Sequence, residues 1–222
     1  MQLVGESEAR TGEALLVLYV REWSRYTVAA KDISSLFQSL DRYWARHEMD
    51  RENIYDVYTL HLVLWRSVLL DRASVEVIDA VLKLVEKERS GETIEHDQIR
   101  QVVDSLISLG LDDKDTSRTT PDIYRCHFKR PFLETTREFY QAESKQFVAE
   151  NGVVEYTKKA ERRLDEENER VRMYLHDSTA ILLKKICYQA LIANHSSTLQ
   201  GEFDVLQDQD REEDLTDSRH TR

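Results

Sequence analysis

The chain has 222 residues, of which 41% are apolar and 33% charged, and its six glycines and two prolines leave few breaks between helix-forming segments. The glycines lie seven or more residues apart, so no P-loop, G-x-G-x-x-G or G-x-S-x-G motif is present. A formal net charge of −11, with eight acidic and three basic residues in 201–222, argues against binding of a nucleic-acid backbone.

The first half of the chain predicts four helical segments. Apolar residues recur at helical spacing over 12–47, which indicates one long helix or two in sequence with a bend at Thr27–Ala30. A second helix is expected to open after Asn53 and a third to end at Gly91. A fourth covers 94–109 and is closed by Gly110. The core-facing residues expected on the first segment are Leu15, Leu18, Tyr19, Trp23, Tyr26, Ala30, Ile33, Leu36, Phe37, Leu40 and Trp44.

The second half continues in the same way after a polar loop at 112–121. An aromatic-lined helix is expected over 123–152, where Pro131 either kinks the helix or marks its true first turn. A charged helix follows over 154–175. Asp177–Thr179 then interrupts the helical pattern before a last helix, which reaches Phe203. No segment alternates as a strand does. The predicted fold class is therefore all-α, with about seven helices joined by short connections.

Cysteine content and hydropathy indicate the cellular compartment in which the protein is expected. Cys126 and Cys187 are 61 residues apart, no signal peptide is recognisable, and we expect both thiols to be reduced, small and buried. No apolar run approaches the roughly 20 residues that a membrane span needs. We therefore expect a cytoplasmic and nuclear protein that contacts neither membrane nor nucleic acid.

Residues capable of catalysis are scattered. No H-E-x-x-H motif occurs, and we expect His61 and His195 to have hydrogen-bonded packing roles. Acids and bases between Glu161 and Arg172 stand at i,i+3 and i,i+4 spacing, Glu166 with Arg170 and Glu169 with Arg172 among them. This spacing is typical of a solvated helix face. No catalytic, cofactor-binding or metal-ligating residue is predicted. The alternative is a helical metal-dependent enzyme built from dispersed residues such as His61, His195 and Glu166.

One aromatic residue departs from the core pattern. Tyr43 lies on the flank of the Leu36–Leu40–Trp44 stripe, beside Arg42 and Arg46. Exposed Tyr and Arg side chains are enriched in protein-binding hot spots. The pattern alone leaves a packing role and a binding role open.

Several segments resemble the cullin family in the order in which the family carries them. The segment Phe139–Ser144 resembles F-Y-x-x-E-S, and Glu155–Leu164 resembles E-Y-x-x-K-A-E-x-R-L. Glu169–His176 is similar to E-x-R-V-x-x-Y-L-H. Upstream, Ile54–Arg66 resembles the I-Y-x-x-Y…L-V-x-W-R helix, and Lys83–Glu92 resembles the K-L-x-E-K-E-R-x-G-E turn. The likeness is greatest to the cullin of the Skp/F-box ubiquitin ligases.

The resemblance implies the N-terminal stalk of a cullin, an elongated all-α array of cullin repeats. By it, 1–11 is a flexible N-terminus and 12–206 holds the end of the first repeat, the second repeat and the start of the third. Residues 207–222 form an acidic, disordered tail. Without the family's first contact helix and its C-terminal domain, the product is expected to be truncated at both ends and unable to bind a RING subunit.

The resemblance also implies a function. The stalk is a non-catalytic scaffold of a cullin-RING ubiquitin ligase that binds a Skp-type adaptor with its F-box protein in ubiquitin-dependent protein catabolism. The second adaptor-contact helix aligns with Asp32–His47, which makes Ser39, Arg42, Tyr43 and Arg46 the candidate adaptor contacts. Adaptor binding is expected to be weakened. A truncated product without retained function is a further alternative.

Overall fold

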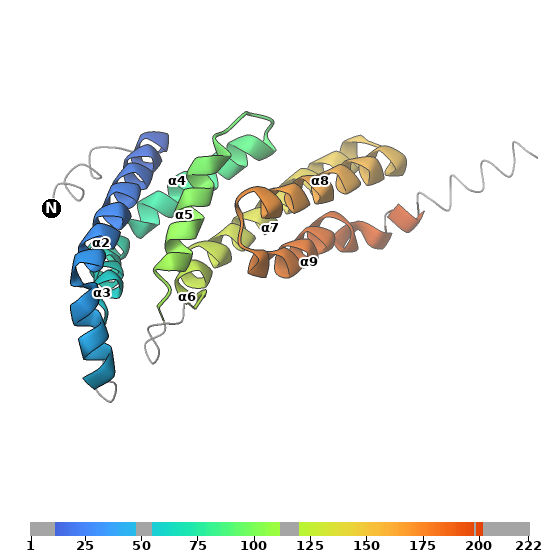
Figure 1. The fold of residues 1–222 in the computed structure, drawn as a ribbon. Helices are drawn as coiled ribbons and strands as arrows, with labels where there is room; N and C mark the ends of the chain where they lie inside the picture. The colour runs from blue at the N-terminus through green and yellow to red at the C-terminus, as the bar shows by residue number, and fades with distance from the viewer. Residues whose placement is uncertain (1–11, 48–54, 112–119, 198, 202–222) are drawn as a thin grey trace, which may run out of the picture. The chain divides into compact units, whose positions relative to one another are not determined.

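The computed structural model describes residues 12–47, 55–111, 120–197 and 199–201; the side chains of 41, 44–47 and 69–72 are outside this description. The described residues form eight α-helices, one of them a single turn, and no strand, which confirms the all-α prediction (Figure 1). They are α2 (Glu13–His47), α3 (Val57–Trp65), α4 (Asp71–Arg89), α5 (His96–Ser108), α6 (Asp122–Tyr124), α7 (Arg130–Glu150), α8 (Val153–Tyr174) and α9 (Ala180–Leu191). None of these helices combines the length and the apolar character that a bilayer crossing requires.

The helices fall into two compact units. The first unit comprises residues 1–132 with 173–175, and the second comprises 133–172 with 176–222. The segments predicted as a flexible N-terminus and a disordered tail, 1–11 and 207–222, lie outside the described residues.

Aromatic side chains of α2 and α3 form the first part of the core of the first unit. The ring of Trp65 lies 5.3 Å from that of Trp23 and 4.7 Å from that of Tyr26, measured between centroids. The Tyr19 hydroxyl is buried within 2.9 Å of the Ser105 hydroxyl, which joins α2 to α5. The N-terminal half of α2 is thus fixed by α3 and α5, and α2 is one uninterrupted helix as the periodicity allowed.

The start of α3 differs from the prediction. Asp56, rather than Asn53, is the N-cap, and its carboxylate accepts a hydrogen bond from the backbone N–H of Thr59 at 2.6 Å. Residues 55 and 56 are not helical, while Asn53 itself lies outside the described residues. Asp and Asn are equally good caps, so composition alone did not separate the two positions.

A π-helical turn, η1 (Arg66–Leu70), joins α3 directly to α4, so these segments form one helical run. This run ends as predicted at Gly91, whose φ of +94° lies in the left-handed region. The Glu92 N–H donates to the Lys87 carbonyl, which satisfies one of the last carbonyl groups of α4.

A second π turn, η2 (Arg125–Lys129), lies between α6 and α7 and carries a buried aromatic stack. Tyr124, Phe128 and Phe132 are wholly buried, with ring centroids 5.5 Å apart at each step. Pro131 is the second residue of α7, but α7 follows η2 without a break, so Pro131 lies inside a helical run that begins at Asp122 and does not mark a first turn. The π turn directly before it is where this run departs from regular α-helix geometry. Cys126 is exposed, which corrects the prediction that both thiols are buried, since η2 turns it away from this stack.

The end of α8 belongs to the first unit. The Tyr174 hydroxyl donates to the Glu88 carboxylate at 2.7 Å, and the Tyr174 ring stacks on that of His96 with centroids 5.7 Å apart. His96 Nε2 lies 3.0 Å from the other Glu88 oxygen. The residues 173–175 are therefore held on α4 and α5 by both ring contact and hydrogen bonds.

The second unit contains a buried polar group where the sequence predicted a solvated face. The Tyr140 hydroxyl donates to Glu167 at 2.6 Å, and Arg170 donates to the same carboxylate oxygen at 3.0 Å. Glu167 and Arg170 are each 3% exposed, so this part of α8 faces the core rather than solvent. The predicted pair of Glu169 with Arg172 does lie on the surface, at 2.6 Å.

A half-buried ion cluster links α7 to α8. Arg163 makes two hydrogen bonds to the Glu143 carboxylate, at 2.5 and 3.1 Å, and a third to Glu166 at 2.7 Å. Lys159 lies 3.1 Å from Glu143. Burial alone would raise the pKa of Glu143, but the hydrogen bonds and charges of Arg163 and Lys159 outweigh it and lower that pKa. Burial alone would lower the pKa of Arg163, but its hydrogen bonds to Glu143 and Glu166 and the charges of these two acids raise it.

Hydrogen bonds to the end of α9 complete the second unit. The Tyr156 hydroxyl donates to the Leu191 carbonyl, and Ser144 donates to the Ala190 carbonyl at 3.2 Å. The helix α9 ends at Leu191, a 3₁₀ turn at Ala193–His195 follows it, and residues 196, 197 and 199–201 are helical again, so the predicted last helix is interrupted rather than continuous.

Candidate functional site

The C-terminal half of α2 carries an apolar row that no other described helix covers. Its members are between 38% and 81% exposed, with Leu36 the most exposed, and we name them the α2 row: Ile33, Leu36, Phe37 and Leu40. The sequence predicted these residues as core. The ring contacts and the hydrogen bond that α3 makes with α2 involve Tyr19, Trp23 and Tyr26, all of which precede this row on α2.

Candidate adaptor residues lie on the side of α2 next to this row. Successive residues of an α-helix are about 100° apart around the axis, so Leu36, Leu40 and Ile33 share an arc of about 60°. Tyr43 borders that arc, with Ser39 beyond it and Arg42 farther round. We name Ser39, Arg42 and Tyr43 the polar flank.

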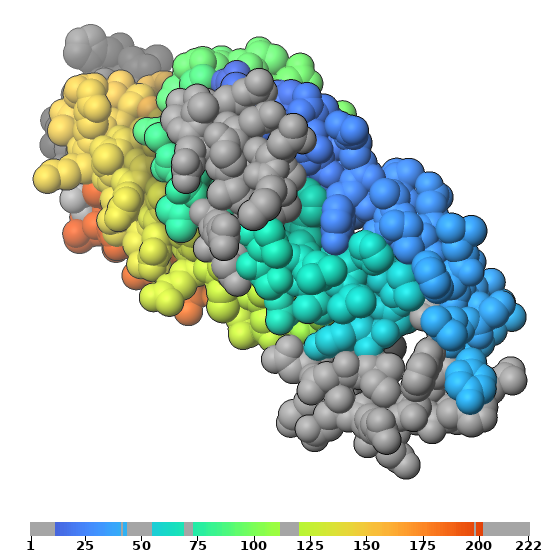
Figure 2. Space-filling view, turned by 90° about the vertical axis from the view of Figure 1, so that its left-hand side faces the viewer, coloured from blue at the N-terminus to red at the C-terminus, as the bar shows by residue number. Residues whose placement is uncertain are grey.

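The described members of the polar flank are all exposed, Tyr43 by 56%. Tyr43 was expected to be exposed and is, but Leu36 and Leu40 of the stripe are exposed as well, so exposure does not separate Tyr43 from the stripe. Arg46 continues the flank one turn later on α2, but its side chain lies outside the described residues. In Figure 2 the surface of α2, coloured blue to light blue, lies open along the right-hand side of the view.

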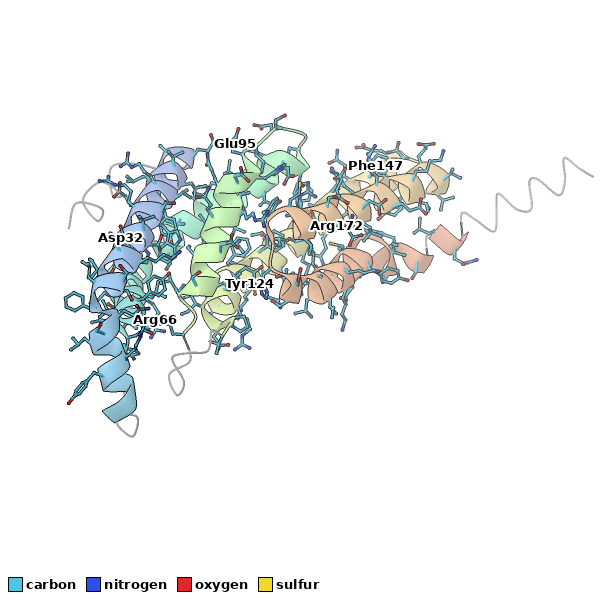
Figure 3. All side chains as sticks on the ribbon, viewed as in Figure 1. Asp32, Arg66, Glu95, Tyr124, Phe147 and Arg172 are labelled. Carbon is cyan, nitrogen blue, oxygen red and sulfur yellow. The ribbon has the colours of Figure 1, made fainter. Side chains whose placement is uncertain are left out.

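The flank is locally basic in a chain whose net charge is −11. Arg42 and Arg46 are one turn apart on α2, and the nearest acids along the helix are Asp32 and Asp41. Side chains beyond Asp32, which Figure 3 labels, stand out from the helix. An arginine pair next to a tyrosine and an apolar row offers charge, hydrogen bonding and contact area to one partner.

A hollow of about 700 Å³ precedes the row on the same helix. Its walls include Tyr26, Ala29 and Asp32 of α2 and Trp65 of α3. The Tyr26 hydroxyl donates to the His61 carbonyl at 2.8 Å, and burial raises the pKa of Tyr26.

The residues of the metal-enzyme alternative have other roles. His61 Nδ1 lies 2.6 Å from the Val57 carbonyl, and His195 Nε2 lies 3.1 Å from the Ser144 hydroxyl. Both rings pack against tyrosines, which confirms the packing role predicted for them. Glu166 pairs with Arg163. In the part of the chain that the structure describes, no three His, Cys, Asp or Glu side chains form a group that could hold a metal.

Sequence comparison agrees with this fold. The family described as "Cullin alpha solenoid domain" matches residues 2–218. Cullin-1 of Dictyostelium discoideum is 37% identical over 217 residues, 97% of this chain, and Cullin-1 of Caenorhabditis elegans is 39% identical over 215 residues, 93% of it. Cell division control protein 53 of Saccharomyces cerevisiae is 31% identical over 198 residues, 88% of the chain.

The match covers only part of each relative. The chain spans 28% of the length of both Cullin-1 proteins and 24% of Cell division control protein 53. Over that part the likeness extends across nearly the whole of this chain and includes the helices that carry the row and the flank. The chain therefore belongs to the cullin family.

Proposed function

We propose that this chain is a non-catalytic scaffold of a cullin-RING ubiquitin ligase and that α2 binds a Skp-type adaptor with its F-box protein. The observation that carries the proposal is the exposed polar flank beside the α2 row, on a helix that the family match includes. In this proposal Ser39, Arg42, Tyr43 and Arg46 contact the adaptor.

The proposed organisation follows the same assignment. Residues 12–206 correspond to the end of the first cullin repeat, the second repeat and the start of the third. The scaffold acts in ubiquitin-dependent protein catabolism in the cytoplasm and nucleus, and this stretch of chain binds the adaptor module rather than a RING subunit.

Apolar area and charge favour adaptor binding over catalysis. The α2 row and Tyr43 expose roughly 500 Å² together, about the size of the largest apolar patch on an ordinary monomer. The arginines of the flank supply orientation, since rim charges contribute more to specificity and association rate than to affinity.

Isothermal titration of the chain with a purified Skp-type adaptor/F-box pair tests the proposal. We expect saturable binding that Tyr43→Ala weakens by at least about tenfold, because an exposed tyrosine at the centre of an interface is a common hot spot. Arg46→Ala is expected to weaken binding as well.

The matched control is Tyr188→Ala on α9, since Tyr188 is 54% exposed and Tyr43 is 56% exposed. This variant is expected to bind as the unmodified chain does. A folded chain that gives no binding heat, or equal losses for the two tyrosine variants, would refute the proposed function.

A further inference from the structure

We draw no further inference here: the strongest candidate, the exposed surface patch of Ile181 and Tyr188 on α9, is an unpartnered apolar face, and nothing in the structure shows what covers it.

Discussion

Glu143→Gln is expected to destabilise the second unit by about 2 kcal/mol at neutral pH. The Glu143 and Arg163 side chains are only 17% and 14% exposed, so little of their interaction is lost to solvent screening. Arg163 makes two hydrogen bonds to the carboxylate, and a hydrogen bond to a charged group contributes about 1.5–3 kcal/mol. Glutamine keeps the shape but presents an N–H₂ group toward donors, which removes most of this contribution.

The effect has a defined pH dependence. Because the pKa of Glu143 is lowered in the folded state, its contribution to stability is fully present above the unfolded pKa, about 4.5. The contribution is lost as pH falls through the folded pKa, where the unfolded carboxyl is already protonated. The difference between the two proteins should therefore be largest at neutral pH and should disappear in acid.

Hydrogen exchange read by mass spectrometry measures this difference locally in α7 and α8. Tryptophan fluorescence serves as an internal control, since all three tryptophans, at 23, 44 and 65, belong to the first unit and should report unchanged unfolding. Glu155→Gln is the matched variant, because its pair with Lys158 is more than half exposed and should contribute nothing measurable. Equal destabilisation by Glu143→Gln in acid and at neutral pH would refute the electrostatic explanation.

Two further changes test the first unit. Tyr19→Phe is expected to cost about 1 kcal/mol at neutral pH through its bond to Ser105. Burial raises the pKa of Tyr19 above 10. The contribution of the Tyr19 hydroxyl to the free energy of unfolding is therefore complete below pH 10 and is lost as pH rises through the pKa of the folded state. Urea unfolding curves should therefore converge in alkali, and parallel curves would contradict this. Gly91→Ala is expected to lower the free energy of unfolding by about 1–2 kcal/mol, because the φ of Gly91 is +94°. Gly152→Ala is the control and should be neutral, since Gly152 has no left-handed φ and no atom lies within 4 Å of the added Cβ. Equal shifts in melting temperature for the two variants would refute the assignment of Gly91 as the helix cap.

The helices were predictable because their apolar faces repeat. In α5, the residues Ile99, Val102 and Leu106 are at most 1% exposed, and their spacing alone indicated the buried face. The limits of α8 were also predicted to within one residue at each end. Periodicity shows that a helix has an apolar face, and in these helices another helix covers it.

The same signal was misleading in α2. The stripe continues through Leu36 and Leu40 with unchanged spacing, although the helices that cover it do not extend so far. Nothing in the local sequence carries that information, since it depends on which other helices pack against this part of α2. The burial of Glu167 and Arg170 was missed for the opposite reason. Charged residues at helical spacing look solvated, and Tyr140, which donates to Glu167, is 27 residues away in the sequence.

The candidate site, too, was predicted only in part from the sequence. Tyr43 was expected to be exposed from its angle on the helix and is, but the stripe residues beside it are exposed as well. Arg42 and Arg46 were noted beside Tyr43 from the pattern, Ser39 and the adaptor role came from the family resemblance, and the role of all four residues in binding stays a prediction. The adjoining α2 row was missed as a surface because its members had been assigned to the core.

The two π turns have an evolutionary consequence. A π turn forms when one residue is inserted into an α-helix without rotating the faces that lie before and after it. Deleting one residue from Arg66–Leu70 would then return α3 and α4 to a plain α-helix with the same buried faces. The same holds for Arg125–Lys129 before α7. Single-residue gaps between cullins are therefore expected to be tolerated at these two places, and residue counting across them shifts by one while the packing stays the same.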